Sequence, residues 1–191
     1  MSAAFPINHV VRYGFAALAA LFALCAMPQA SAQRAEAPEA SVKAAFLYKF
    51  AGYIEWPPEA FAAPDAPFVI GVMGADDIAA ELAKIVPGRN VGAHPVVVKK
   101  LRESDPVRGI HLLFVWRVEA GRLQQVLRAS QRDGVFAVTE NEKGLELGAA
   151  INFLTEDRVG FEVSLESAEK TGHRISSRML TVARRVIPKA S

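Results

Sequence analysis

Short runs of apolar residues alternate with stretches of helical periodicity, and this alternation restricts the fold more than any other feature of the sequence. The two clearest runs are 68–72 (FVIGV) and 110–116 (IHLLFVW). Continuous apolar runs of this length are typical of strands that are buried on both faces. Such strands occur mainly in parallel sheets with helices on both sides. The sequence therefore predicts an α/β fold, a three-layer sandwich with a mostly parallel mixed sheet and flanking helices.

The first predicted helix covers residues 41–53. Its predicted buried face consists of the apolar residues Val42, Phe46, Phe50 and Tyr53. Lys43 and Lys49 are expected to lie off this face, and the helix cannot continue through Trp56, because two prolines follow that residue. The remaining α/β elements are helices at 76–86 and 119–129 and strands at 95–99 and 135–138.

The last third of the chain predicts a C-terminal β-hairpin and one more helix. Residues 150–154 and 158–165 form the hairpin, and alternation in its second strand places Glu162 and Ser164 on a solvent-exposed face. A final helix is expected to begin near Ser176 or Ser177, which are good N-cap residues. Its predicted buried stripe comprises Met179, Leu180, Ala183, Val186 and Ile187.

Residues 1–32 have the layout of a cleavable signal peptide. Arg12 precedes an uncharged apolar run at 15–27, and Ala30 and Ala32 supply the small residues of a signal peptidase site. The run is shorter than the roughly 20 residues that span a bilayer, which disfavours a retained anchor. We therefore expect export to the periplasm, no transmembrane segment after cleavage, a flexible leader at 33–40 and one domain at 41–188.

Composition excludes several classes of function. The chain has 22 basic and 20 acidic residues, and Arg12 is the one charged residue within 1–32, so the exported part has a net charge of only +1. This balance offers no electrostatic basis for binding nucleic acid. The single cysteine, Cys25, lies in the signal peptide. The exported chain therefore has neither a disulfide nor a thiolate metal site.

No pattern of residues indicates catalysis, and the sequence predicts no catalytic residue, cofactor or metal. His94, His111 and His173 are not spaced as a helical metal-binding pair, and no G-x-S-x-G motif is present. Gly71 and Gly74 stand where a phosphate-binding loop would, but they lack its further glycine and lysine, so a tight turn is favoured over a nucleotide site.

Two stretches are candidates for binding a partner or a ligand. The first is the closing basic segment, residues 170–178 (KTGHRISSR), whose candidate residues are Lys170, His173, Arg174, Ser176, Ser177 and Arg178. Basic and hydroxyl side chains at a helix N-terminus can hold an anion, but the same segment can be a solvated turn with serine caps. The second is Trp56, which is either an exposed docking edge or an anchor in the core.

Five stretches together resemble the YfiR family of periplasmic proteins. They are VKAAFLYKFAGYIEWP, FVIGVMG, IHLLFVW, the hairpin GAAINF…VGFEVSL and the closing HRISSRMLTVARRV. They occur in the family's order and cover nearly all of the chain from about residue 41 to residue 186. One departure is Ser164, which stands where the family usually has asparagine, and another is the lack of the cysteines with which some members form disulfides.

The resemblance implies a periplasmic α/β domain without catalytic activity. The family's namesake restrains an inner-membrane diguanylate cyclase by binding its periplasmic part, which lowers cyclic di-GMP and biofilm formation. The resemblance thus implies a negative regulator whose partner is the periplasmic part of an inner-membrane signalling protein, and it also implies a possible homodimer.

Two functional hypotheses remain open at this point. In the first, the chain is a signalling module that contacts its partner through Trp56 and the closing basic segment. In the second, it is a periplasmic receptor for a small ligand. The ligand would then bind near Gly74 and Trp116, since open α/β sheets bind ligands at the carboxyl ends of their strands.

Overall fold

The computed structural model describes residues 38–189. The predicted signal peptide, the cleavage site and most of the predicted leader lie outside the described residues. None of the helices between residues 38 and 189 is long and apolar enough to cross a membrane.

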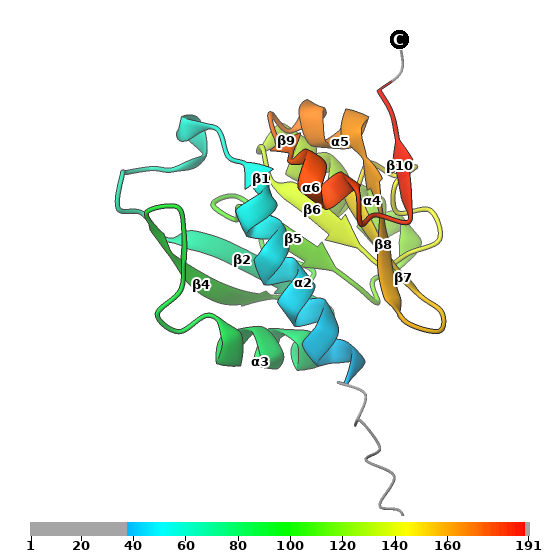
Figure 1. Ribbon diagram of the computed structural model, residues 1–191, viewed down its shortest axis with the longest axis horizontal. Helices are drawn as coiled ribbons and strands as arrows, with labels where there is room; N and C mark the ends of the chain where they lie inside the picture. The colour runs from blue at the N-terminus through cyan, green and yellow to red at the C-terminus, as the bar shows by residue number, and fades with distance from the viewer. Residues whose placement is uncertain (1–37, 190–191) are drawn as a thin grey trace, which may run out of the picture. The chain divides into compact units, whose positions relative to one another are not determined.

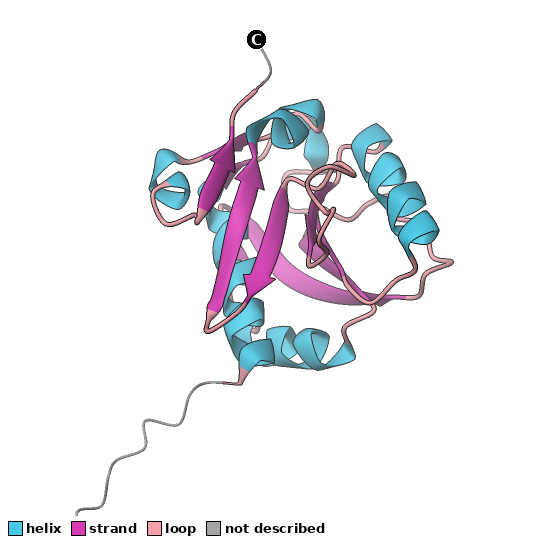
Figure 2. Cartoon of the chain, turned by 90° about the vertical axis from the view of Figure 1, so that its right-hand side faces the viewer, coloured by secondary structure: helices cyan, strands magenta, loops and turns pink. Residues whose placement is uncertain are grey.

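An eight-stranded mixed sheet forms the centre of the molecule (Figures 1 and 2). Its strand order is β10-β8-β7-β6-β5-β2-β4-β3, and the five strands from β7 to β4 in this order run parallel. Strands β7 and β8 form the predicted antiparallel hairpin, and the prediction of a mostly parallel mixed sheet is confirmed. The strands are β2 (Phe68–Met73), β3 (Asn90–Val91), β4 (His94–Leu101), β5 (Leu112–Val115), β6 (Phe136–Thr139), β7 (Ile151–Thr155), β8 (Val159–Ser164) and β10 (Arg185–Ile187).

Helices cover both faces of this sheet and complete the predicted three layers. Helices α2 (Glu39–Tyr53) and α3 (Asp76–Ile85) pack on one face, and α4 (Ala120–Arg132) packs on the other. The buried apolar residues accordingly form two clusters, one on each side of the sheet. Two short helices, α5 (Leu165–Lys170) and α6 (Ser177–Leu180), follow the hairpin. Helix α5 is an element that the sequence pattern did not predict.

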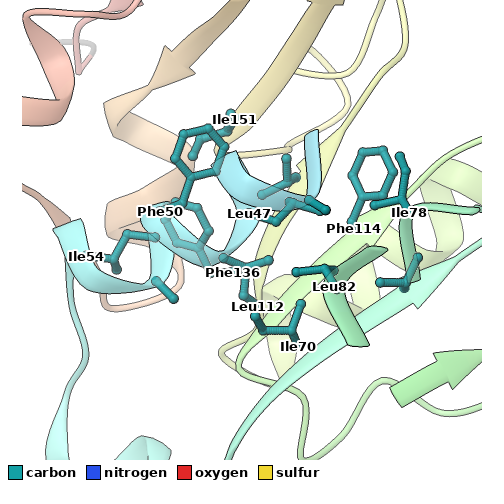
Figure 3. Packing of buried hydrophobic residues seen from close by; sticks show 14 of the residues in the cluster. Leu47, Phe50, Ile54, Ile70, Ile78, Leu82, Leu112, Phe114, Phe136 and Ile151 are labelled. Atoms are coloured by element: carbon teal, nitrogen blue, oxygen red, sulfur yellow. The ribbon is translucent and has the colours of Figure 1, made fainter. Parts of the chain in front are cut away.

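The larger cluster lies beneath α2. Figure 3 shows Leu47 and Phe50 of this helix, and Ile54 directly after it, among strand residues such as Leu112 and Phe136. The ring of Phe50 meets that of Phe161 edge to face, with 4.9 Å between ring centroids, a geometry that aromatic pairs prefer. Small residues, Ala44 and Ala51, are fully buried in the same face and let α2 approach its neighbours closely.

The buried face of α2 differs from the predicted one. It comprises Lys43, Ala44, Leu47, Phe50 and Ala51, so Phe46 is half-buried and Tyr53 is exposed. The prediction is confirmed for Phe50 and was wrong for Phe46 and Tyr53, because it followed the large apolar residues and gave the alanines no weight. Phe46 and Tyr53 therefore lie at the edge of the packed face, where they border solvent.

Lys43 of the same helix was expected to lie off the buried face, but its side chain is only 1% exposed. The ammonium group forms ion pairs with Glu39, one turn earlier in α2, and with Glu140, which follows β6. It also lies 5.0 Å from the centre of the Trp116 ring. A buried lysine is tolerated only with such partners. Helical periodicity could not predict this burial, because Glu140 comes from a distant part of the chain.

The C-terminal segment also differs from its prediction. The final helix has only four residues, and Val186 and Ile187 belong to β10, which pairs in parallel with β8. Glu162 of β8 is buried rather than solvated, because Arg185 of β10 forms an ion pair with it and the Asn152 amide donates a hydrogen bond to it at 3.1 Å. Ser164 is buried as well. The open edge of β8 thus recruits β-branched residues that the sequence pattern assigned to a helix.

We expect Lys43→Ala to lower the free energy of unfolding by about 3 kcal/mol, because it leaves the largely buried Glu140 carboxylate without its cation. The matched control is Lys84→Ala on α3, whose ion pair with Glu81 is solvent-exposed and which should change stability by less than about 1 kcal/mol. Urea denaturation at neutral pH measures both variants. Equal stabilities for the two variants would contradict the structural role of Lys43.

Candidate docking surface

A two-stranded antiparallel ribbon brings the two candidate stretches of the sequence together. Strand β1 (Ile54–Glu55) follows α2, and it pairs with β9 (Arg174–Ile175) from the closing basic segment. The Arg174 Nε atom lies 2.9 Å from Glu55 Oε2, although these residues are 119 positions apart in the chain. One further backbone hydrogen bond, from Ser176 N to the Tyr53 carbonyl, extends the ribbon. The end of α2 and the start of α6 are thereby fixed to each other.

Trp56 packs between this ribbon and the core. Its indole nitrogen donates a hydrogen bond to the Ala51 carbonyl at 2.8 Å. Its ring meets Phe68 and His173 edge to face, with 4.7 Å between ring centroids in both pairs. The half-buried ring therefore fits the role of a core anchor better than that of a docking edge.

His173 is buried behind the same ribbon, with 1% of its surface exposed. The Thr171 hydroxyl donates to the Ala168 carbonyl, so it accepts from His173 Nδ1 at 2.9 Å, and this assignment leaves Nε2 as the unprotonated nitrogen. Among residues 38–189, no partner hydrogen-bonds to Nε2. Burial lowers the pKa of His173 to about 4, and the nearby His111 acts in the same direction. A neutral, buried ring of this kind does not attract an anion.

His111 belongs to the same buried aromatic group. Its Nδ1 atom accepts a hydrogen bond from the Val69 backbone amide at 3.0 Å, and its ring stacks on Phe61 and Phe68. Burial lowers the pKa of His111, although the nearby Ala60 carbonyl favours the charged form. His111 is thus a packed histidine that is hydrogen-bonded through Nδ1, whereas its Nε2 atom has no hydrogen-bond partner among residues 38–189.

The remaining candidate residues of the closing segment lie on the surface around α6. Arg174, Ser177 and Arg178 are exposed, and Ser176 is half-buried at the N-cap position of α6 without a side-chain capping hydrogen bond. Because α6 has only four residues, it offers little of the dipole that makes a helix N-terminus attract anions. The idea of an anion site at this helix end therefore loses its structural basis.

Lys170 does not join the other candidates. It is the last residue of α5, where it forms an ion pair with Glu166 at 2.6 Å. It faces an open hollow of about 620 Å³, and the other residues that line this hollow all belong to α4. The structure thus divides the closing basic segment into a part beside α4 and a part beside α2.

A small groove beside α6 was missed by sequence reasoning. We call it the α2–α6 groove, and its volume is about 180 Å³. It is lined by Phe46, Lys49, Phe50 and Tyr53 of α2, Phe161 of β8, and Arg178, Met179 and Val182 in and after α6. The sequence signal for this groove was the half-exposed edge of α2. It was overlooked because Phe46 and Tyr53 had been assigned to the buried face of the helix.

At the position that the ligand hypothesis requires, the chain segments that follow β2 and β5 pack closely against each other. A β-carbon built on Gly74 would lie 1.8 Å from the carbonyl oxygen of Trp116. The two backbone segments thus touch, and Gly74 is in the left-handed region with φ of 77°. Within residues 38–189, no group of three or more potential ligand residues is placed to hold a metal ion.

Comparison with known proteins places the chain in a family. The model of the YfiR/HmsC-like family matches residues 40–184. The chain belongs to the YfiR/HmsC-like family. At the level of the family, its members are periplasmic regulators of diguanylate cyclases that act on membrane signalling proteins, and the family is regulatory rather than catalytic. The matched range of this YfiR/HmsC-like protein includes all residues of the β1–β9 ribbon and of the α2–α6 groove.

A solved structure has a similar fold. It is the crystal structure of a conserved domain protein from Vibrio cholerae O1 biovar El Tor, which is 10% identical in sequence with a TM-score of 0.50. The similarity covers 77% of this chain and 60% of the Vibrio chain, so this chain matches somewhat less than two thirds of that protein's length. At this level of identity the likeness concerns the fold alone. No curated protein matches the chain.

The buried state of His173 gives a pH dependence that can be measured. Its pKa falls from an unfolded value of about 6.5 to about 4 in the folded protein, so folding favours the neutral ring. This contribution to stability is complete above pH 6.5 and is lost as the pH falls from 6.5 toward 4. We expect His173→Gln to remove about 2 kcal/mol of the acid-induced loss of stability over that range.

Urea denaturation at several pH values between 7.5 and 4 tests this expectation, because the difference between wild type and His173→Gln isolates the histidine from the other titrating groups. A constant difference in unfolding free energy across the range would show that His173 titrates normally.

Proposed function

We propose that this chain is a non-catalytic periplasmic signalling protein that binds the periplasmic part of an inner-membrane diguanylate cyclase, or of a similar sensor, and restrains it. Its output is then a lower level of cyclic di-GMP, which makes it a negative regulator of biofilm formation. The observation that carries this proposal is the family match over residues 40–184. The predicted export signal supports the compartment.

Restraint of this kind needs no reacting group in the regulator. A protein that binds the inactive conformation of a receptor better than the active one shifts the receptor toward inactivity. The shift is limited by the difference between the two affinities, and a nearly complete switch requires a ratio of about 10⁴. A surface with different affinities for the two receptor states is therefore the physical requirement, and the β1–β9 ribbon ties together the elements that would supply it.

The exposed residues of the closing segment are the proposed contacts on that surface. Arg174, Ser177 and Arg178 lie beside the end of α2, whereas Trp56 and His173 lie behind them and hold the ribbon in place. Lys170 lies apart, against α4. We therefore separate the candidate residues into exposed contacts and buried supports.

The alternative function, a receptor for a small ligand, receives less support. Pockets for small molecules usually have volumes of about 300–1,000 Å³ and are mostly apolar. The apolar α2–α6 groove has a volume of about 180 Å³, which is below that range. The larger hollow of about 620 Å³ is open to solvent and is lined by arginine, lysine and glutamine side chains.

Measurement of intracellular cyclic di-GMP in the native host tests the proposal. We expect deletion of the gene to raise the cyclic di-GMP level and expression of the full chain to restore it. A chain without residues 1–32 is the matched control, and it should fail to restore the level because it stays in the cytoplasm. An unchanged level after deletion would refute the repressor function.

A further inference from the structure

The α2–α6 groove combines an apolar floor with an exposed apolar rim. Phe50, Phe161 and Met179 are almost fully buried and form the floor, whereas Tyr53 and Val182 are 41% and 66% exposed. In the described part of the chain, only one other large apolar side chain, Val97, is comparably exposed. Two of three such residues thus border one small groove, and clustered apolar exposure marks interaction sites more often than scattered residues do.

Two cationic side chains flank this apolar surface. Lys49 and Arg178 line the groove, and across residues 38–189 neither side chain forms an ion pair. The lining contains no acidic residue. The neighbouring Arg174 differs, because Glu55 pairs with it. The entrance of the groove is therefore positively charged and favours an acidic partner.

The size of the groove limits what enters it. A volume of about 180 Å³ lies below the range of small-molecule pockets but suits one large apolar side chain. Buried side chains of this kind, inserted in a pocket and surrounded by polar contacts, supply most of the binding energy at many protein interfaces. The occupant therefore combines one apolar anchor with nearby negative charge.

We propose that the α2–α6 groove is a docking site for an acidic segment of a partner protein, which inserts one large apolar side chain between Tyr53 and Val182 and places carboxylates against Lys49 and Arg178. This inference rests on the proposed function, since it locates the surface that the restrained partner uses. A second copy of the chain fits less well. In a two-fold symmetric dimer the same patches face each other, so the lysine and arginine of one copy would meet those of the other.

A designed peptide tests the docking site directly. The probe is a short acetylated and amidated peptide with one phenylalanine flanked by two glutamates on each side, added to the isotope-labelled full-length protein. We expect chemical-shift changes at the Val182 methyl groups and the Tyr53 ring, with saturation in the millimolar range. Peptides with alanine in place of phenylalanine, or with lysine in place of glutamate, should bind roughly tenfold more weakly or not at all.

Variants of the protein locate the binding site. The double variant Lys49→Glu/Arg178→Glu should weaken binding of the probe at least roughly tenfold, as should Val182→Asp. These three positions are exposed, so the thermal midpoint should stay unchanged. The matched control is Arg128→Glu, an exposed arginine of α4 on the opposite face of the sheet, and it should bind the probe as wild type does. Absence of binding at millimolar peptide, or equal binding by the double variant, would overturn the proposal.

Two further outcomes separate the groove from the proposed function. If deletion of the gene raises cyclic di-GMP but the double variant restores the low level as fully as wild type, the partner binds elsewhere and only the groove proposal fails. If deletion changes nothing, the repressor function fails, and the peptide measurement still decides whether the groove binds acidic segments.

Sedimentation analysis tests the other occupant of the groove. A wild-type dimer that Val182→Asp disrupts would overturn the proposal in favour of a second copy.

Discussion

The packing of α2 across the sheet is the contact on which the other features depend. Phe50 and Leu47 fill the space above the central strands, and Ala44 and Ala51 let the helix lie close to them. This position places Lys43 against Glu140 at one end of the helix. At the other end it carries the chain into β1 and Trp56, and so into the ribbon with β9. The edge of α2 that does not pack becomes one wall of the α2–α6 groove.

A surface built in this way suits a protein that acts by binding. Regulation by population shift requires different affinities for the two receptor states, and a surface that is ordered before the partner arrives binds more tightly because no ordering cost lowers the affinity. The ribbon, the Trp56 anchor and the buried His173 ring order the end of α2 and the start of α6 within one fold. The YfiR/HmsC-like family is a regulatory family, whereas the same fold class elsewhere hosts unrelated functions.

The sequence predicted the sheet and the three longer helices well because those elements are determined by local apolar patterns. The runs that became β2 and β5 consist almost wholly of apolar residues, and the helix predicted at 119–129 corresponds to α4. The wrong predictions for Lys43 and Glu162 share one cause, which is contact between distant segments. The local sequence pattern predicts that Lys43 and Glu162 are surface residues. In the structure they are buried, because each forms an ion pair with a residue from a distant part of the chain, Lys43 with Glu140 and Glu162 with Arg185. The two candidate stretches were found separately, but their pairing through Glu55 and Arg174 has no local signature.

Amide hydrogen exchange at Ser176 tests most directly whether α2 and the closing segment form one ordered surface. The Ser176 amide donates to the Tyr53 carbonyl, so it can exchange only when the ribbon opens. If the account is correct, its free energy of exchange approaches that of global unfolding, as for the amides in the middle of α2. Exchange of Ser176 at the rate of an unstructured peptide, with the middle of α2 still protected, would show that the closing segment is loose and would contradict the account.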